Sequence, residues 1–115
     1  MKLVTVLDCK DPQALAPFWA AALGYKEMGA AAQYVVLGTG DRTQHQLILQ
    51  GVAEPKTAKN RMHLDIHTDD IEGEAERLIG LGATKLDGPM EEWGERWIVL
   101  ADPEGNELCV CTASH

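Results

Sequence analysis

One short segment holds the side chains best suited to chemistry. Across residues 61–67, polar and aliphatic residues alternate, so His63, Asp65 and His67 project from one face of an expected strand. A carboxylate beside an imidazole fixes its tautomer and orientation, as a general base requires. We therefore predict catalytic roles for His63 and Asp65 and a ligand contact for His67. Two alternatives stay open: a structural role for His63, and a solvated His67 near the strand end.

Four further residues are candidates for contacts. Cys109 and Cys111 stand two positions apart on the last expected strand and so share a face. No basic neighbour lowers their pKa, which favours buried, inert thiols over nucleophiles, with Cys109 also a ligand contact. Gln50 pairs with a ligand or with the neighbouring strand. Trp97 is a binding-site wall or a core aromatic, depending on strand parity.

The elements that must position these residues occur twice. The Leu-Gly pair at residues 23–24, which ends an amphipathic segment, recurs at residues 81–82. A strand-like run precedes each helical segment, and short strands follow it. The chain is therefore predicted to be a duplicated strand-helix-three-strand unit of the α+β class.

The first half predicts one helix and three strands. The helix is expected to begin after Asp11 and end at Gly24, with its regular part confined to the later turns because Pro17 lacks a backbone donor. Residues 25–32 are compatible with either a loop or a strand. The predicted strands cover residues 2–8, 33–37 and 45–50, and the last two form a hairpin.

The second half follows the same order. Its helix is expected to begin after Asp69 or Asp70 and to end at Gly82, with Ile79 among its buried residues. A tight turn is predicted at residues 102–106. The strands are expected at residues 61–67, 83–86, 96–101 and 107–111.

Composition limits the classes of partner. The 115 residues carry a net charge of −8, which offers no attraction for nucleic acid or an anionic membrane surface. Apolar stretches are of strand length, so no membrane segment is expected. Three cysteines give no disulfide framework, and we expect reduced thiols and a cytoplasmic location.

The motifs together resemble the vicinal oxygen chelate superfamily, which includes glyoxalases, extradiol dioxygenases and bleomycin-resistance proteins. The resemblance covers nearly the whole chain and is most specific at Asp-Pro-Glu-Gly-Asn. It rests on Phe18-Trp19 before Leu23-Gly24-Tyr25, on Asn60-Arg61-Met62-His63-Leu64-Asp65, on Leu81-Gly82-Ala83, and on residues 102–108.

This resemblance implies a single glyoxalase-like domain, residues 1–115, with two βαβββ modules at residues 1–52 and 61–112 and a connector at 53–60. The modules would form a mixed, cup-shaped sheet with the helices on its outer face. The resemblance also implies a homodimer, and a divalent metal held in the cup by His and Glu ligands.

The ligand positions that the resemblance implies are mostly occupied by other residue types. Only His63 is a usual ligand, and Cys109 stands where a carboxylate is expected. The other two positions fall at Val4 or Thr5 and at Ile48 or Gln50. We therefore predict no family-type metal site. The alternative is a non-standard zinc site containing His63 and nearby Asp, His and Cys donors.

These observations predict a glyoxalase-like protein that binds a small oxygenated organic molecule in the cup, without the family's metal. One alternative is a lyase, isomerase or dioxygenase, working with a rearranged metal site or with His63 as a metal-free base. Another is a resistance protein that sequesters an antibiotic of the bleomycin type, whose positive charge the chain would attract.

Overall fold

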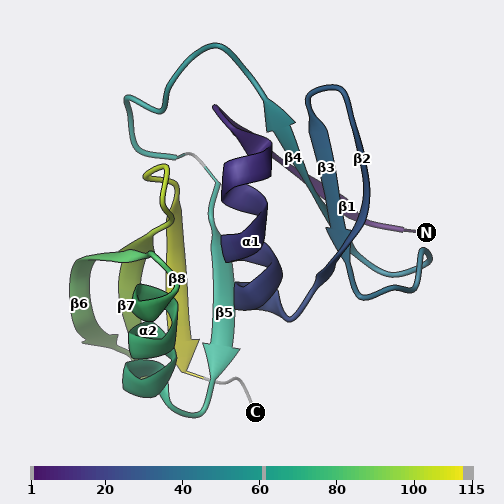
Figure 1. Cartoon of the computed structure of the whole chain (residues 1–115). Coiled ribbons are helices and arrows are strands. Elements are labelled where there is room, and N and C mark those ends of the chain that lie inside the picture. The colour runs from purple at the N-terminus through teal and green to yellow at the C-terminus, as the bar shows by residue number, and fades with distance from the viewer. Residues whose placement is uncertain (1, 61, 113–115) are drawn as a thin grey trace. The chain divides into compact units, whose positions relative to one another are not determined.

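The computed structural model describes residues 2–60 and 62–112, and these form two compact units with the boundary between Lys56 and Thr57. This boundary falls within the expected connector. Each unit contains one helix and one four-stranded mixed sheet (Figure 1), which confirms the α+β class and the two βαβββ modules. Within the described ranges no helix is long and apolar enough to cross a membrane.

In the first unit, the first and last strands are parallel neighbours and the other pairs are antiparallel, in the order β1-β4-β3-β2. The hairpin predicted around residues 38–44 joins β3 to β4. The elements are β1 (Val4–Cys9), α1 (Pro12–Leu23), β2 (Lys26–Ala31), β3 (Tyr34–Gly38) and β4 (Gln46–Gly51).

The helix α1 begins where it was predicted to, directly after Asp11. Asp11 caps it by accepting from the Ala14 N–H at 3.2 Å, and the helix continues without a break through Pro17 to Leu23. A proline removes only one intrahelical donor, and burial of the Phe18 and Trp19 rings holds the helix on the sheet. The prediction that only the later turns would be regular is therefore wrong.

One face of the first sheet is covered and the other is not. Val35 and Leu37 on β3, with Leu47 and Leu49 on β4, are fully buried against α1. Alternate residues on the same strands face away from the helix. The ambiguous segment 25–32 becomes the edge strand β2, whose pairing with β3 compensates for the weak strand preference of its Gly and Ala residues.

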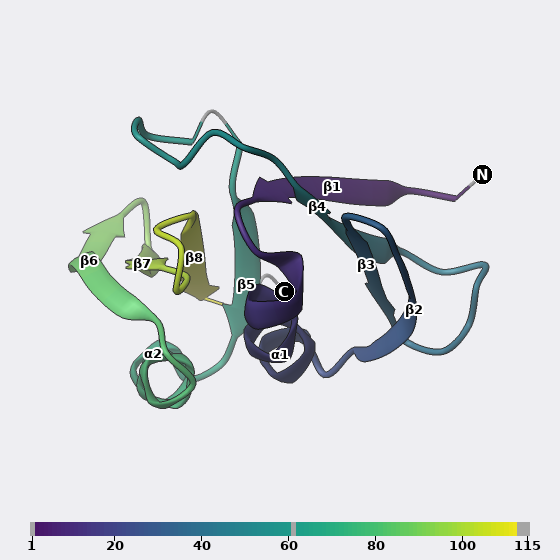
Figure 2. The same ribbon diagram turned by 45° about the horizontal axis from the view of Figure 1, so that its top comes forward.

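The second unit repeats this topology, with strand order β5-β8-β7-β6 and a parallel β5–β8 pair. Figure 2 shows α2 viewed nearly along its axis, covering one face of this sheet. The elements are β5 (Leu64–Thr68), α2 (Ile71–Gly80), β6 (Thr84–Glu92), β7 (Glu95–Ala101) and β8 (Glu107–Thr112).

Two predictions for this unit are wrong in detail. Ile79 was expected in the core but is 43% exposed, because it lies on the flank of the stripe formed by Ile71, Ala75 and Leu78. The strand expected at 83–86 instead runs to Glu92, with register shifts against β7 that accommodate Gly-Pro within it.

The strand expected at residues 61–67 also differs at both ends. It begins at Leu64 and ends at Thr68, while residue 61 lies outside the described part of the chain. Met62, expected on the apolar face, precedes the strand and is 64% exposed.

The predicted tight turn is organised by a buried carboxylate. Asp102, which is 3% exposed, accepts from the backbone N–H of Glu104 at 2.8 Å and of Asn106 at 2.9 Å. It also accepts from the Asn106 side-chain amide. Gly105 has a φ of 89°, a conformation that glycine adopts without strain. The turn thereby fixes how β7 leads into β8.

Replacement of Asp102 should therefore be costly. Asp102→Ala leaves buried donors without their acceptor, so we expect a loss of roughly 2–3 kcal/mol in the free energy of unfolding, measured by urea denaturation. Asp69→Ala, at an exposed position beside α2, should change it by less than about 0.5 kcal/mol. Equal losses in the two variants would contradict this account of the turn.

Candidate functional site

The face of the second sheet opposite α2 is hollowed into a pocket. Register pairs Asp65 with Cys109 and His67 with Cys111, and partners on neighbouring strands project from the same face. Trp97 on β7 is in register with Cys111 and completes this group. The pocket has a volume of about 360 Å³ and is lined by His63, Asp65, His67, Glu95, Arg96, Trp97, Cys109 and Cys111.

His63 and Asp65 form the best-defined polar contact in the pocket. The His63 Nδ1 atom lies 2.8 Å from Asp65 Oδ1, and the side chains are 40% and 42% exposed. A carboxylate only accepts, so Nδ1 carries the proton and Nε2 keeps its lone pair. Because both groups are solvated, their attraction adds little stability, and the main effect of the contact is to orient the ring.

His67 is oriented in the same way by the backbone. Its Nδ1 lies 3.0 Å from the carbonyl oxygen of Thr112, which can only accept, so Nδ1 is again the protonated nitrogen. The ring is therefore held by β8 although it belongs to β5. His67 is exposed, and its Nε2 keeps a lone pair.

The two thiols on β8 are poor nucleophiles in this setting. Burial, followed by the nearby negative charge of Asp65, raises the pKa of Cys109. The same causes, in the same order, raise the pKa of Cys111 to about 11. No disulfide joins Cys9, Cys109 and Cys111, all of which the structure describes. The geometry thus agrees with the interpretation of these residues as protonated and inert.

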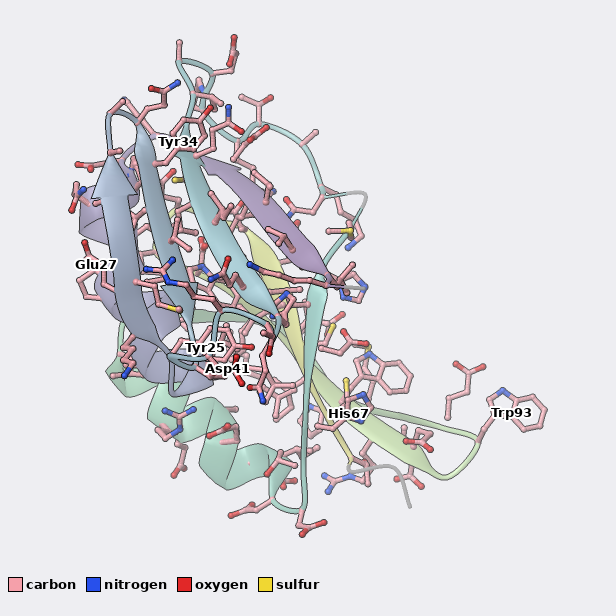
Figure 3. The ribbon with its side chains drawn as sticks, turned by 90° about the vertical axis from the view of Figure 1, so that its right-hand side faces the viewer. Tyr25, Glu27, Tyr34, Asp41, His67 and Trp93 are labelled. Carbon is pink, nitrogen blue, oxygen red and sulfur yellow. The ribbon has the colours of Figure 1, made fainter. Side chains whose placement is uncertain are left out.

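Two tryptophans that are close in sequence have different surroundings. Trp97 is half-buried and lines the pocket. Trp93 is 92% exposed and projects from the β6–β7 turn, away from its strands (Figure 3). Positive φ angles of 57° at Trp93 and 77° at Gly94 form this two-residue turn, as in type I′ hairpins.

Two pocket residues were not identified from the sequence. Glu95 and Arg96 begin β7, and Arg96 donates to Glu72 on α2. This ion pair lowers the pKa of Glu72, mainly through the hydrogen bond from Arg96. The ion pair holds the guanidinium against α2, and nothing in the local sequence identifies this long-range pairing in advance.

Gln50 is the one predicted contact residue outside this pocket. It lies on β4 in the first unit, where its side-chain amide is 3.5 Å from the hydroxyl of Tyr34 on β3. This long contact corresponds to the alternative in which Gln50 pairs with the neighbouring strand.

The residues at the expected family metal positions do not fit that metal. In the first unit, Val4 has no donor atom and the Thr5 hydroxyl is engaged with His45 at 2.9 Å. Ile48 has no donor atom either, and Gln50 offers only a neutral amide. These positions lack the anionic oxygens that hard divalent ions prefer, and no chemical step is assigned to such an ion.

A second histidine arrangement, in the first unit, was missed in the sequence. The His45 ring is held between Thr5 Oγ1, 2.9 Å from Nε2, and the Tyr25 hydroxyl, 3.0 Å from Nδ1. The three residues are half-buried. Because the partners are 40 and 20 residues away, no local spacing could reveal this relay.

Comparison with known proteins identifies the family. The chain belongs to the glyoxalase-like domain family, whose model matches residues 4–111. The fold is similar to that of a glyoxalase/bleomycin resistance protein/dioxygenase family enzyme from Burkholderia phytofirmans PsJN. That structure has a TM-score of 0.79 at 19% identity, and the match covers 96% of this chain and 97% of the other.

Two further structures with the same fold are those of a fosfomycin resistance protein and an antibiotic-binding protein. The fosfomycin resistance protein FosX from Mesorhizobium loti has a TM-score of 0.72 at 17% identity, over 99% of this chain and 92% of the other. TnmS3, an antibiotic-binding protein from Streptomyces sp. CB03234, has a TM-score of 0.67 at 19% identity, over 99% and 98%. A comparison with curated protein sequences found no match.

The His45 relay should contribute to stability. His45→Ala removes both hydrogen bonds and leaves two hydroxyls partly buried, so we expect a loss of about 1–3 kcal/mol in the free energy of unfolding. Tyr25→Phe should cost less, because it removes one contact. The control is His63→Ala, whose solvated ion pair should contribute less than about 1 kcal/mol. A greater loss in the control would contradict this assignment.

The raised thiol pKa gives a pH-dependent prediction for the metal-free chain. At pH 8 a thiol with a pKa of about 11 is only about one-thousandth thiolate, so iodoacetamide should label Cys111 slowly. Labelling should accelerate about tenfold per pH unit up to about pH 11. Peptide mass spectrometry would follow Cys111 separately from Cys9, with circular dichroism confirming the fold. A rate that levels off by about pH 10 would show an ordinary thiol, whose pKa is about 8.5.

Proposed function

We propose that this protein binds a small oxygenated organic molecule in the pocket of its second unit, without the metal typical of its superfamily. The observation that carries the proposal is the oriented His63–Asp65 pair, with its 2.8 Å contact, inside a pocket that also has an aromatic wall. The free Nε2 of His63 accepts a hydrogen bond from a ligand hydroxyl or enol. Trp97 covers the apolar part of the ligand.

The size of the pocket narrows the ligand class. About 360 Å³ lies near the lower end of the range of about 300–1,000 Å³ typical of small-molecule sites. Such a volume suits a compound of a few carbons bearing neighbouring oxygens, or a single aromatic ring. Bulky glycopeptides exceed it. The pocket volume thus favours a small metabolite-like ligand over sequestration of a bleomycin-type drug within this unit.

The geometry also supports an enzymatic version of this proposal. With Nδ1–H held by Asp65, Nε2 of His63 can accept a proton from a carbon or hydroxyl of the bound molecule. The resulting imidazolium would be stabilised by the Asp65 carboxylate. This chemistry is that of a metal-free isomerase or lyase, and it needs no thiolate from Cys109 or Cys111.

Antibiotic binding is the second candidate function. The fold is shared with FosX and TnmS3, and the net charge of −8 favours cationic compounds. A homodimer, as the superfamily resemblance implies, would enlarge the available groove. Calorimetry with fosfomycin and with bleomycin distinguishes this candidate from a small-metabolite site. Binding of either drug would support antibiotic binding, and binding of neither would count against it.

Ligand binding can be tested with two tryptophan variants. We expect at least one member of a panel of α-hydroxycarbonyls, hemithioacetals and catechols to raise the melting temperature, with affinity then measured by calorimetry. Trp97→Ala should weaken that ligand at least tenfold, since about 1.4 kcal/mol of contact is lost. His63→Ala should also weaken it.

Trp93→Ala is the matched control, because Trp93 is 92% exposed and does not line the pocket. Affinity in this variant should equal that of the unmodified chain. Equal losses in the Trp93 and Trp97 variants, or no thermal shift across the panel, would count against the pocket as the binding site.

A further inference from the structure

The pocket also contains two overlapping groups of metal-ligating side chains. One group is His63, Asp65 and Cys109, and the other is Asp65, His67 and Cys111. In each, one ligand atom per residue lies within 4.8 Å of the others. Apart from His63, which directly precedes β5, these residues lie on the paired strands β5 and β8, so a hydrogen-bonded ladder fixes their spacing.

In the first group, the polar side chains already contact one another. His63 donates to one oxygen of Asp65, and the Cys109 thiol also hydrogen-bonds to this carboxylate. A carboxylate has two oxygens and about four lone-pair positions, so Asp65 retains acceptor capacity beyond these contacts. His63 and Cys109 therefore act on Asp65 as orienting neighbours, and the carboxylate can still ligate an ion on its other side.

In the second group, the ring of His67 is already oriented as in metal sites. The Thr112 carbonyl accepts a hydrogen bond from the Nδ1–H of His67, which leaves the lone pair of Nε2 available to a metal in a fixed orientation. Metal-bound histidines almost always donate a hydrogen bond from the N–H of their other ring nitrogen in this way. Asp65 and His67 are exposed and Cys111 is half-buried, so an ion can reach them from solvent.

The donor types select the metal. One imidazole nitrogen, one thiolate sulfur and one carboxylate oxygen suit zinc, whereas magnesium and calcium require mostly oxygen. In a tetrahedral zinc site the ligand atoms are about 3.3–3.8 Å apart, so the group needs only small side-chain rotations to close around an ion.

We propose that Asp65, His67 and Cys111 bind one divalent ion of the zinc class, with a fourth position open to the pocket. His63 and Cys109 position Asp65 and do not ligate the ion. The site lies within the second unit and does not use the superfamily's expected ligand set. It stands independently of the proposed organic ligand, although an oxygen of that ligand would fit the open position.

The test uses the full chain, freed of metal by a chelator and titrated separately with Zn²⁺ and Co²⁺. We expect one ion per chain by calorimetry, and Co²⁺ should give the near-ultraviolet charge-transfer absorption of a thiolate ligand. Cys111→Ser should remove that absorption and weaken Zn²⁺ binding at least 100-fold. His67→Gln should weaken binding similarly while keeping the absorption at saturating Co²⁺, so the proposal does not depend on one variant folding.

Matched variants in the other group complete the experiment. Cys109→Ser should keep the charge-transfer absorption. His63→Ala should weaken Zn²⁺ binding by about tenfold, less than the loss in Cys111→Ser, as expected for a positioning residue. Trp97→Ala should leave Zn²⁺ binding unchanged, which separates this site from the organic-ligand proposal. No Zn²⁺ binding, or loss of the absorption in Cys109→Ser but not in Cys111→Ser, would overturn the assignment.

Discussion

The parallel pairing of β5 with β8 is the constraint on which the candidate site depends. It places Asp65 opposite Cys109 and His67 opposite Cys111, on the sheet face that α2 leaves free. Burial of alternate residues such as Leu108 and Val110 against α2 fixes this register. A slip of one residue would turn every one of these side chains to the other face. Core packing therefore determines the chemistry on the opposite side of the sheet.

The arrangement works through geometry more than through strong electrostatics. The His63–Asp65 pair is too solvated to add much stability, and the raised pKa of Cys111 keeps its thiol protonated in the absence of an ion. Such groups are available to a partner from solution. The hydrogen-bonded ladder between β5 and β8 holds these side chains in place but leaves some of their lone pairs available to a ligand, as a binding site requires.

Most of the architecture could be predicted from the sequence, because repeated Leu-Gly pairs and strand alternation are local signals. The His63–Asp65–His67 face was likewise predictable from alternation. The sequence alone could not show that Cys109 and Cys111 lie on the same sheet face as these residues, because strand register depends on long-range pairing. The His45 relay was missed for the same reason. Local patterns also misjudged two helix residues. At Pro17, packing against the sheet overrode the low helix propensity of proline. At Ile79, the buried stripe of α2 was narrower than expected.

The same parallel pairing has a consequence for how the chain folds during synthesis. Each sheet joins its first and last strands, so closure must bring together segments separated by a helix and two further strands. The loop-closure entropy of such non-local contacts slows folding. Among the strands that the structure describes, β8 is the partner of β5, so β5 stays without this partner until β8 has left the ribosome, just as β1 waits for β4. During that interval β5 presents an unpaired edge to the cellular environment, and its polar face protects it from aggregation.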